Sequence, residues 1–265
     1  MSQKVIISLA AMQGGAPLDY DALTEDIIRS VDAGAAICHL HSRDACGAMT
    51  ADCGPMIECF ENARAERDFV VQASTGGVSD LTMEQRCHPL DFDVVESCSL
   101  NGGSTNLGEY VYRNSFDDIR FVARKAHERH VAPEIEVFDI GMIQAVEGLV
   151  QDAPFSTPRF YNLVFGHKGG MQPTMKGLLA FESFLPQGDP WGVTHFGREG
   201  WDFLAGAIAL GAAEVRIGFE DSRYLGNGIQ AKHNWQLVER LRELIESIGY
   251  EVATPAEARA TFGKR

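Results

Sequence analysis

Two histidines separated by one residue follow a short apolar run early in the chain. His39 and His41 come directly after residues 35–38. Successive side chains of a strand point to opposite faces, so the two imidazoles share one face. A catalytic zinc typically takes three protein ligands and leaves one position open, so this pair supplies part of a metal site. The alternative is a pair of buried histidines with a packing role alone.

A second strand-like run, far downstream, ends in two carboxylates. Residues 215–219 lead directly into Glu220 and Asp221. Because the two acids are adjacent, one can ligate a metal while the other, beside a basic group that sets its ionisation, acts as a base. Arg216 is close enough in sequence to be that basic group. The alternative is an ordinary ion pair between Arg216 and Asp221 at a strand end.

Several basic residues stand in loops where an anionic substrate could meet them. Lys168 lies in the glycine-rich loop 166–170, and Arg198 follows Gly197. A cation in a glycine-containing loop suits phosphate or carboxylate. Arg43 is a further candidate, although an ion pair with the adjacent Asp44 is the simpler reading.

Other polar residues also fall near predicted strand ends. The segment 74–77, Ser-Thr-Gly-Gly, resembles a small anion-binding turn, in which glycines admit backbone N–H groups and Ser74 adds a hydroxyl. Such turns also form for geometric reasons alone. Glu136 is flanked by Ile135 and Val137, which take the opposite face of a strand. Glu136 is therefore a candidate substrate or supporting group.

Strand-like runs alternate with helical patterns along the whole chain. The eight predicted strands are residues 5–10, 35–39, 69–73, 92–96, 134–138, 160–165, 191–194 and 214–218. This alternation predicts an α/β fold, a (β/α)8 TIM barrel, as a single domain over residues 1–265, with a doubly wound open sheet as the main alternative.

In a TIM barrel, catalytic residues gather at the carboxyl ends of the strands. The candidates follow that rule, since the two histidines end the second predicted strand and the two acids end the eighth. Ser74 follows the third strand, and Ser104 or Thr105 follows the fourth. Only the first strand separates the second from the eighth around a closed ring. A metal held between those two strands is therefore geometrically reasonable.

Composition limits the possible partners. The chain has 265 residues and a formal net charge of -14, which argues against nucleic acid and anionic membranes because both need clustered Lys and Arg. No run of about 18 apolar residues suggests a membrane span. The amino terminus shows no export signal, so a cytoplasmic location is expected. The six cysteines lack a C-x-x-C pair, which favours reduced thiols over disulfides.

Taken together, these motifs resemble those of the β-keto acid cleavage enzyme family. The resemblance rests on residues 33–44, 74–77, 215–221 and 254–259, which occur in the same order as in the family and extend through almost the whole chain. It implies a barrel that holds a divalent metal, usually zinc, through His39, His41 and Glu220. It also implies a reaction between a β-keto acid and acetyl-CoA that gives acetoacetate and a new acyl-CoA, and a homo-oligomer, usually a tetramer.

The same resemblance implies roles for further residues. Asp221, poised by Arg216 and Ser74, would remove a proton from C2 of the keto acid, while the metal stabilises the enolate. Glu136 and either Thr105 or Ser104 would orient the reacting groups. Lys168 and Arg198 would contribute to CoA binding.

Two other classes of protein compete with this reading. A metal-dependent amidohydrolase also uses His-x-His on a barrel, but it usually places that motif on the first strand and further histidines after the fifth and sixth. Only His167 lies near such a place. Dependence on acetyl-CoA separates these two classes. A non-catalytic barrel that binds a small acid or serves as a subunit is the third possibility, and it predicts binding without metal-dependent turnover.

Overall fold

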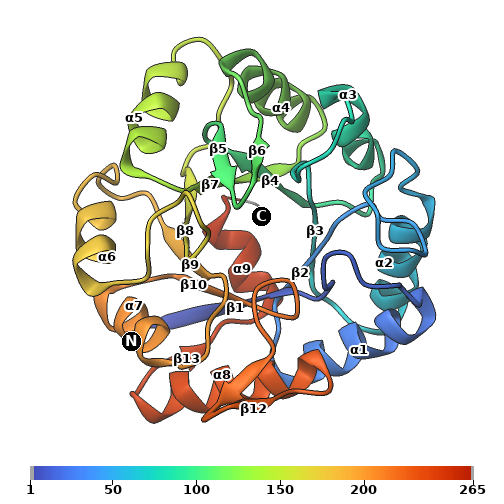
Figure 1. The fold of residues 1–265 in the computed structure, drawn as a ribbon, viewed down its shortest axis with the longest axis vertical. Coiled ribbons are helices and arrows are strands. Elements are labelled where there is room, and N and C mark those ends of the chain that lie inside the picture. The colour runs from blue at the N-terminus through green and yellow to red at the C-terminus, as the bar shows by residue number, and fades with distance from the viewer. Residues whose placement is uncertain (1–2, 264–265) are drawn as a thin grey trace.

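A closed ring of eight parallel strands forms the centre of the structure, a computed structural model that describes residues 3–263. The strands are β1 (Lys4–Ala10), β2 (Ile37–Leu40), β3 (Val70–Ala73), β4 (Ser97–Asn101), β7 (Ala132–Val137), β8 (Phe160–Phe165), β9 (Trp191–His195) and β10 (Glu214–Ile217). Each pairs with the next, and β10 pairs with β1 to close the ring (Figure 1). The predicted TIM barrel is confirmed, and the open sheet is wrong.

Helices surround this ring and bury their apolar faces against it (Figure 1). They are α1 (Tyr20–Ala33), α2 (Gly54–Glu66), α3 (Met83–Arg86), α4 (Phe116–Glu128), α5 (Ile140–Leu149), α6 (Met175–Glu182), α7 (Asp202–Leu210) and α8 (Asn234–Ser247). In α8 an apolar stripe faces the barrel, since Leu237, Leu241 and Ile245 are buried at helical spacing. Over the part of the chain that the structure describes, no helix is both long and apolar enough to cross a membrane.

The fourth barrel strand lies later in the chain than the sequence predicts. Residues 92–96 are not a strand, and the chain forms β4 directly after them, at Ser97–Asn101. Ser97 and Ser99 make hydrogen bonds inside the barrel, while Cys98 and Leu100 pack in the core outside it. A strand whose inward face is built from serines lacks the apolar alternation that marks the others, and this explains the error.

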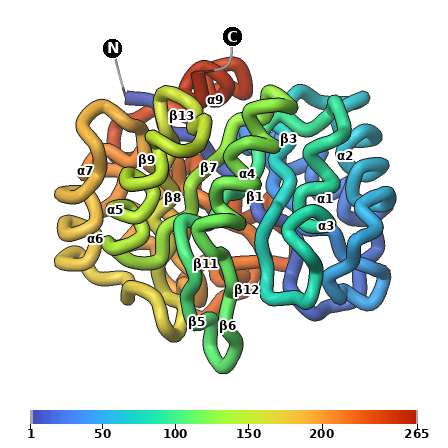
Figure 2. Tube along the Cα trace, turned by 90° about the horizontal axis from the view of Figure 1, so that it is seen from above, coloured from blue at the N-terminus to red at the C-terminus, as the bar shows by residue number. Residues whose placement is uncertain are grey.

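Two hairpins stand at one end of the barrel, and a short helix closes the other. The hairpins β5–β6 (Thr105–Leu107 and Tyr110–Tyr112) and β11–β12 (Tyr224–Gly226 and Ile229–Gln230) lie at the carboxyl ends of the strands (Figure 2). At the opposite end, β13 (Glu251–Val252) pairs with β1 and leads into α9 (Pro255–Thr261). Thr254 forms a capping box with Glu257 at the start of α9.

The interior of the barrel is apolar at its amino end and polar above it. Ala258 of α9 and the nearby Phe262 pack against the first inward residues of the strands, which include Ile6, Ile37, Val70 and Phe160. One step further along their strands come Gln72, Glu134, Asn162 and Thr194, while Glu214 is the first residue of β10; all five are fully or almost fully buried. TIM-barrel interiors are usually filled by branched apolar residues, so this buried polar layer calls for a functional explanation.

Candidate active site

The two predicted histidines and Glu220 converge at the carboxyl ends of the strands. His39 is the third residue of β2 and His41 follows its last residue, so both imidazoles point into the barrel mouth. The Nε2 atoms of the two rings are 3.4 Å apart, and Nε2 of His41 is 3.2 Å from Oε1 of Glu220. One ligand atom from each of the three side chains lies within 4.8 Å of the others. Among residues 3–263 this is the group of side chains that could hold a metal ion.

These separations fit a divalent metal ion. Bonds of about 2.05 Å in a tetrahedral site place neighbouring ligand atoms about 3.3 to 3.4 Å apart. Burial lowers the pKa of His39 to about 3, which leaves the imidazole neutral and its lone pair free to bind. Oε2 of Glu220 is buried and has no hydrogen-bond partner in the described chain. The side chains present therefore match the donor set of a zinc-like cation.

A chain of hydrogen bonds through the buried polar layer fixes the orientation of His39. Nδ1 of His39 lies 2.7 Å from Oε1 of Gln72, and the amide nitrogen of Gln72 donates to Oε2 of Glu134 at 2.8 Å. From the other side, Asn162 donates to Oε1 of Glu134 at 2.6 Å and accepts from the Thr194 hydroxyl at 2.9 Å. Both amides thus direct their N–H groups at the same carboxyl group. Gln72 must then present its oxygen to His39, which places the proton on Nδ1 and the lone pair on Nε2.

Arg216 lies between three carboxylates at the floor of the mouth. Its Nε and Nη2 donate to the two oxygens of Asp221 at 3.0 and 2.9 Å. Nη1 donates to Glu136 and Nη2 also donates to Glu220, each at 3.1 Å. The bidentate contact with Asp221 holds that carboxylate next to the metal cluster. The ordinary ion pair that the sequence allowed does form, but here it is part of a buried charge network.

Burial and neighbouring charges shift the pKa values of these acids in different directions. Burial raises the pKa of Glu136 to about 7, although the guanidinium of Arg216 opposes the shift. For Glu220, burial also acts to raise the pKa, but His41 and Arg216 together outweigh it and hold the pKa well below its ordinary value. Glu220 is therefore ionised as a metal ligand requires, while Glu136 can exchange a proton near neutral pH.

A tight turn after β10 sets the positions of Glu220 and Asp221. Gly218 has a φ of 137°, and a Cβ atom at this position would lie 2.0 Å from the carbonyl oxygen of Ala10. The N–H of Glu220 donates to that same carbonyl at 3.2 Å, and the N–H of Asp221 donates to the carbonyl of Gly218 at 3.0 Å. Because the end of β1 leaves no room for a side chain at position 218, a glycine is required to turn the two acids into the mouth.

The other predicted residues lie at various distances from this cluster. Ser74 directly follows β3, where its hydroxyl accepts from the N–H of Gly76 and lies 3.4 Å from the Ser99 hydroxyl. Thr105 begins the hairpin strand β5 opposite Tyr112. The Ser104 hydroxyl accepts from the Asn114 N–H at 2.8 Å. Both alternatives for the orienting residue therefore stand beside the mouth, on the hairpin or at its base.

The two cations proposed for CoA occupy different environments. Lys168 is exposed at the mouth and pairs with Glu109 on the β5–β6 hairpin. Arg198 is only 2% exposed and stacks on Trp201, with 3.8 Å between its guanidinium carbon and the ring centre. Burial lowers the pKa of Arg198 to about 10. Lys168 is accessible to a ligand, whereas Arg198 is largely covered.

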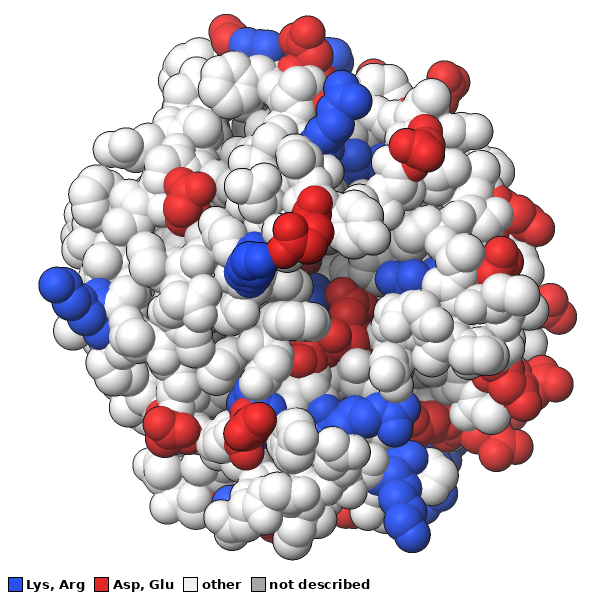
Figure 3. Space-filling view, viewed as in Figure 1, with Lys and Arg blue, Asp and Glu red and all other residues white. Residues whose placement is uncertain are grey.

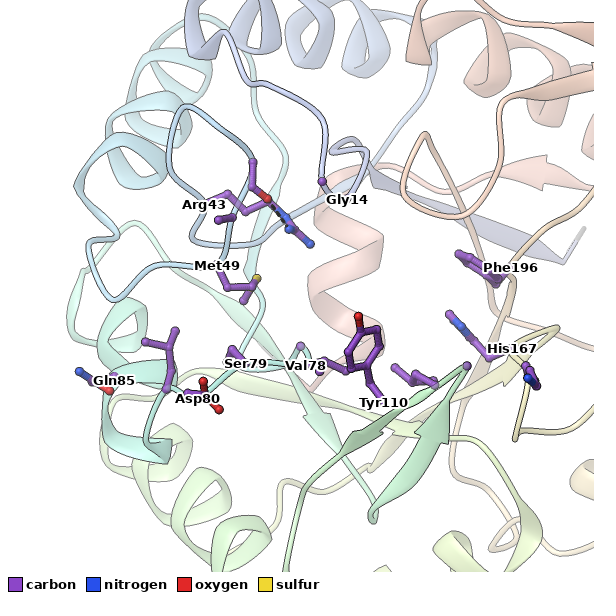
Figure 4. A pocket seen from close by; sticks show the side chains of 18 residues that line it. Gly14, Arg43, Met49, Val78, Ser79, Asp80, Gln85, Tyr110, His167 and Phe196 are labelled. Atoms are coloured by element: carbon purple, nitrogen blue, oxygen red, sulfur yellow. Dashed lines mark hydrogen bonds between the residues drawn. The ribbon is translucent and has the colours of Figure 1, made fainter.

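A cavity of about 1250 Å³ opens at the mouth. Its walls come from the loops after β1, β2, β3 and β8 and from the β5–β6 hairpin, and they include Arg43, Met49, Gly77, Tyr110 and His167 (Figure 4). In the middle of this face, acidic side chains lie at the floor of a hollow and basic side chains at its rim (Figure 3). The volume suits a ligand larger than a simple keto acid.

The sequence interpretation missed the buried layer that supports the site. Gln72, Glu134 and Asn162 each stand among apolar residues, at the third position of β3, β7 and β8 respectively, and β7 also carries Glu136. A polar residue at an inward strand position is a usable signal, because burial without a hydrogen-bond partner is costly. It cannot show in advance which of these residues contact one another.

Comparison with known proteins gives close matches over nearly the whole chain. The profile of the beta-keto acid cleavage enzyme family matches residues 7–263. The chain is 34% identical over 269 residues to the 3-keto-5-aminohexanoate cleavage enzyme of Fusobacterium nucleatum, which covers 98% of this chain and 97% of that protein. It is 35% identical over 249 residues to the enzyme of the same name from Acetoanaerobium sticklandii, covering 93% and 90%.

A more distant relative and a solved structure extend the comparison. The 3,5-dioxohexanoate:acetyl-CoA acetone transferase of Paraburkholderia graminis is 27% identical over 294 residues, covering 97% of this chain and 94% of that protein. The solved structure of ObcA in a ternary complex with a C4-CoA adduct and oxalate superposes with a TM-score of 0.76 at 20% identity. It covers 93% of this chain and 67% of that one, and it shares the fold.

The fold and the site define a TIM-barrel protein with a histidine–histidine–carboxylate group at the carboxyl ends of its strands. The family profile and the identity to its relatives make the assignment specific. The chain belongs to the beta-keto acid cleavage enzyme family. The resemblance drawn from the sequence motifs is confirmed, and nothing in the comparisons supports the amidohydrolase alternative. His167, the histidine nearest to the amidohydrolase pattern, stacks on Phe196 outside the metal-binding group.

Proposed function

We propose that the protein converts a β-keto acid and acetyl-CoA into acetoacetate and the CoA thioester of the remaining acyl group. C2 of the keto acid loses a proton and attacks the acetyl carbonyl carbon, which releases CoA as a thiolate. The thiolate then attacks the original keto carbon, the C2–C3 bond breaks, and C2 recovers a proton as acetoacetate leaves. The observation that carries the proposal is the placement of Asp221 beside the His39–His41–Glu220 group. The acetyl-CoA dependence is supported by the name of the Paraburkholderia graminis relative.

The metal in this proposal is a divalent cation, zinc by the resemblance, held by His39, His41 and Glu220. When bound, such a cation supplies Lewis-acid stabilisation for negative charge that develops on the keto oxygen. Gln72 keeps the His39 ring in the tautomer that can bind it, through the 2.7 Å contact at Nδ1.

The remaining groups position the reactants and move the proton. Asp221 accepts the C2 proton, and Arg216 holds its carboxylate in place through two hydrogen bonds. Glu136, with its pKa raised to about 7 mainly by burial, takes up or returns a proton at the far side of Arg216. Ser74, together with Thr105 or Ser104, orients the keto acid at the strand ends.

Further parts of the proposal concern CoA, assembly and location. Lys168 at the exposed rim meets the phosphates of CoA, and a contribution from Arg198 stays a prediction because its side chain is largely covered. A homo-oligomer, a tetramer by the resemblance, and a cytoplasmic location also stay predictions.

The first experiment measures the reaction directly. Metal-loaded protein is incubated with acetyl-CoA and a panel of β-keto acids, and chromatography follows acetoacetate and new acyl-CoA. We expect the two products in equal amounts with at least one keto acid and none with His39→Ala, which lacks a metal ligand. If metal-loaded protein forms no acyl-CoA across a broad panel, the transferase assignment is refuted and amide or lactone hydrolysis becomes the next test.

A second experiment separates the base from the metal ligand. Asp221→Asn keeps the size of the side chain and removes the proton acceptor, so we expect kcat to fall by about 10²- to 10⁴-fold. Metal content per chain, measured by elemental analysis, should equal that of the wild type. Glu220→Ala, the matched change one residue away, should lose the metal as well. Full activity in Asp221→Asn would assign the proton transfer to another group.

A further inference from the structure

In the described part of the chain, the Arg43 guanidinium faces the cavity without an acidic partner. Its side chain extends from the loop after β2 toward Gly14 and into the space that His167 borders from the other side (Figure 4). Nη1 donates to the carbonyl of Gly47 at 2.7 Å, whereas Nε is buried and has no hydrogen-bond partner within residues 3–263. A cation at a cavity wall without a carboxylate partner is suited to an anion that arrives with a ligand.

The adjacent Asp44 does not neutralise Arg43, contrary to the simplest interpretation of the sequence. Oδ1 of Asp44 instead accepts the N–H groups of Cys46 and Ala48, each at 2.9 Å, and so closes its own loop. The Tyr20 hydroxyl donates to the backbone carbonyl of Arg43 at 2.8 Å. This loop is therefore held by specific contacts, and Arg43 is positioned before any ligand binds.

Arg43 is also close to the metal-binding group. It lies two residues after His41, which limits the separation of their Cα atoms to about 7 Å. Met49 forms a β-bridge with Arg43, and a Cβ atom at Gly77 would lie 3.0 Å from the methyl group of Met49 and 3.8 Å from Nδ1 of His41. Gly77 thus separates His41 from the cavity wall by a single residue layer. Arg43 therefore lines the cavity one residue layer away from the metal-binding group.

The charge distribution singles out Arg43 among the cations of the cavity. The chain carries a formal net charge of -14, so its overall electrostatic field repels anions. A positive charge at this wall of the cavity opposes that repulsion locally. Lys168, the other lysine or arginine of the lining, already pairs with Glu109. Arg43 therefore has its full charge available for a ligand.

We propose that Arg43 binds an anionic oxygen group, a carboxylate or a phosphate, of a reactant held in this cavity. The proposal rests on the proposed function, in which both reactants carry such groups. The keto acid brings one carboxylate at C1 and, in a dicarboxylic acid, a second at its far end. Acetyl-CoA brings its phosphates. Arg43 then adds a docking point that the metal-binding group and Asp221 do not provide.

Two matched pairs of reactants identify the source of the anion. 3-Oxoadipic acid and 3-oxohexanoic acid have the same chain length and differ by the second carboxylate, while acetyl-CoA and S-acetylpantetheine differ by the nucleotide that carries the phosphates. Each is assayed with wild type, Arg43→Gln and Arg43→Lys. A charged hydrogen bond contributes enough that its loss raises KM by about ten- to hundredfold. We expect that rise in Arg43→Gln for the reactant that carries the anion, with partial recovery in Arg43→Lys.

The pattern of the changes gives the answer. A rise for acetyl-CoA but not for S-acetylpantetheine assigns Arg43 to the phosphates. A rise for 3-oxoadipic acid alone assigns it to a far carboxylate, and a rise for both keto acids assigns it to C1. Arg120→Gln on α4, which removes the same charge from a side chain that does not line this cavity, should leave every KM unchanged. Equal KM values for wild type and Arg43→Gln across all four reactants overturn the proposal.

Direct binding keeps this test separate from that of the reaction. If metal-loaded wild type turns over no keto acid of the broad panel, the proposed function fails, and titration calorimetry with CoA and each keto acid still decides on Arg43. An unchanged dissociation constant in Arg43→Gln then overturns the proposal, and a weaker one supports it. If a melting curve shows that Arg43→Gln does not fold, Arg43→Lys carries the test, since an ammonium cannot form the paired contacts of a guanidinium. A several-fold higher KM or dissociation constant is then expected, and equality with wild type refutes the proposal.

Discussion

The charges around Arg216 explain why the site favours a divalent cation. Arg216 contributes one positive charge, and Glu136, Glu220 and Asp221 contribute three negative charges when ionised, which leaves a net charge of -2. Buried charge without compensation is costly. Because its pKa is raised to about 7, Glu136 can bind a proton near neutral pH and so remove part of this negative charge. A divalent cation between His39, His41 and Glu220 offsets the rest.

Gln72 is expected to control metal affinity although it does not touch the metal. Gln72→Met keeps the length of the side chain but removes the acceptor for Nδ1 of His39. Loss of such a supporting contact typically weakens metal binding about 10- to 100-fold. Competition with a chromophoric chelator measures the dissociation constant.

Ser97→Ala provides the control for the Gln72 variant. It removes one acceptor of the Gln72 amide nitrogen, at 3.2 Å, and leaves both the contact with His39 and the contact with Glu134 in place. We expect nearly unchanged metal affinity in this variant. Equal affinity in Gln72→Met and wild type would show that the His39 tautomer is fixed by something other than Gln72.

At the scale of elements, the local pattern of apolar residues predicts most strands and helices of the barrel. It fails for the strand whose inward face is polar. Strands such as β8 and helices such as α8 carry apolar periodicities that the sequence reveals directly. β4 carries serines on its inward face, because its partners on the neighbouring strand β3 and in the turn after it are Gln72, Ser74 and Thr75. Its identity as a strand depends on those partners, which sequence alone does not specify.

The turn after β10 gives a prediction at the same scale. In Gly218→Ala the new Cβ atom would meet the carbonyl oxygen of Ala10, and the φ of 137° is unfavourable for alanine. We expect a loss of about 2 kcal/mol or more in the free energy of unfolding, together with weaker metal binding because Glu220 shifts. Urea unfolding and chelator competition measure the two effects.

Gly211→Ala serves as the control that distinguishes the effect of the steric clash from the effect of the positive φ alone. Gly211 also has a positive φ, 111°, but a Cβ atom there would meet nothing within 4 Å. This variant should lose about 1 kcal/mol and keep its metal affinity. Similar losses in both variants, with metal binding intact, would show that the turn tolerates the side chain.

At the scale of the whole molecule, the residues of the candidate metal site were predictable from the sequence. The buried hydrogen bonds that support them were not. His39, His41 and Glu220 could be named because the catalytic groups of a TIM barrel gather at the carboxyl ends of its strands, and because β2 and β10 lie on either side of β1. The contact of Gln72 with Glu134, and of Glu134 with Asn162, depends on the rotation of side chains inside the closed ring. The sequence does not contain that information in a local form.

Glu214 makes the stability of the barrel depend on pH. It is fully buried, neither of its oxygens has a hydrogen-bond partner in the described residues, and burial together with the nearby Glu134 raises its pKa well above the ordinary value. The folded state keeps a proton that the unfolded chain releases above about pH 4.3. The free energy of unfolding therefore falls as pH rises from that value toward the pKa of the folded state.

Glu214→Gln should remove this dependence, because the amide is neutral in both states. Melting curves at pH 5 and pH 8 measure the difference in stability between the variant and wild type. We expect this difference to favour the variant more strongly at pH 8 than at pH 5. Glu58→Gln removes the same charge from the exposed face of α2 and should show no such difference. A constant difference between wild type and Glu214→Gln across this range would contradict a protonated Glu214.

The helix α9 fills the amino end of the barrel, and the described ends of the chain lie on that side (Figure 2). The cavity opens on the opposite side. In the proposed reaction, all reactants and products would therefore enter and leave through this one opening. An enzyme immobilised on a solid support through either end would therefore present its open mouth to the solution, and a linker there would leave the path of the reactants clear.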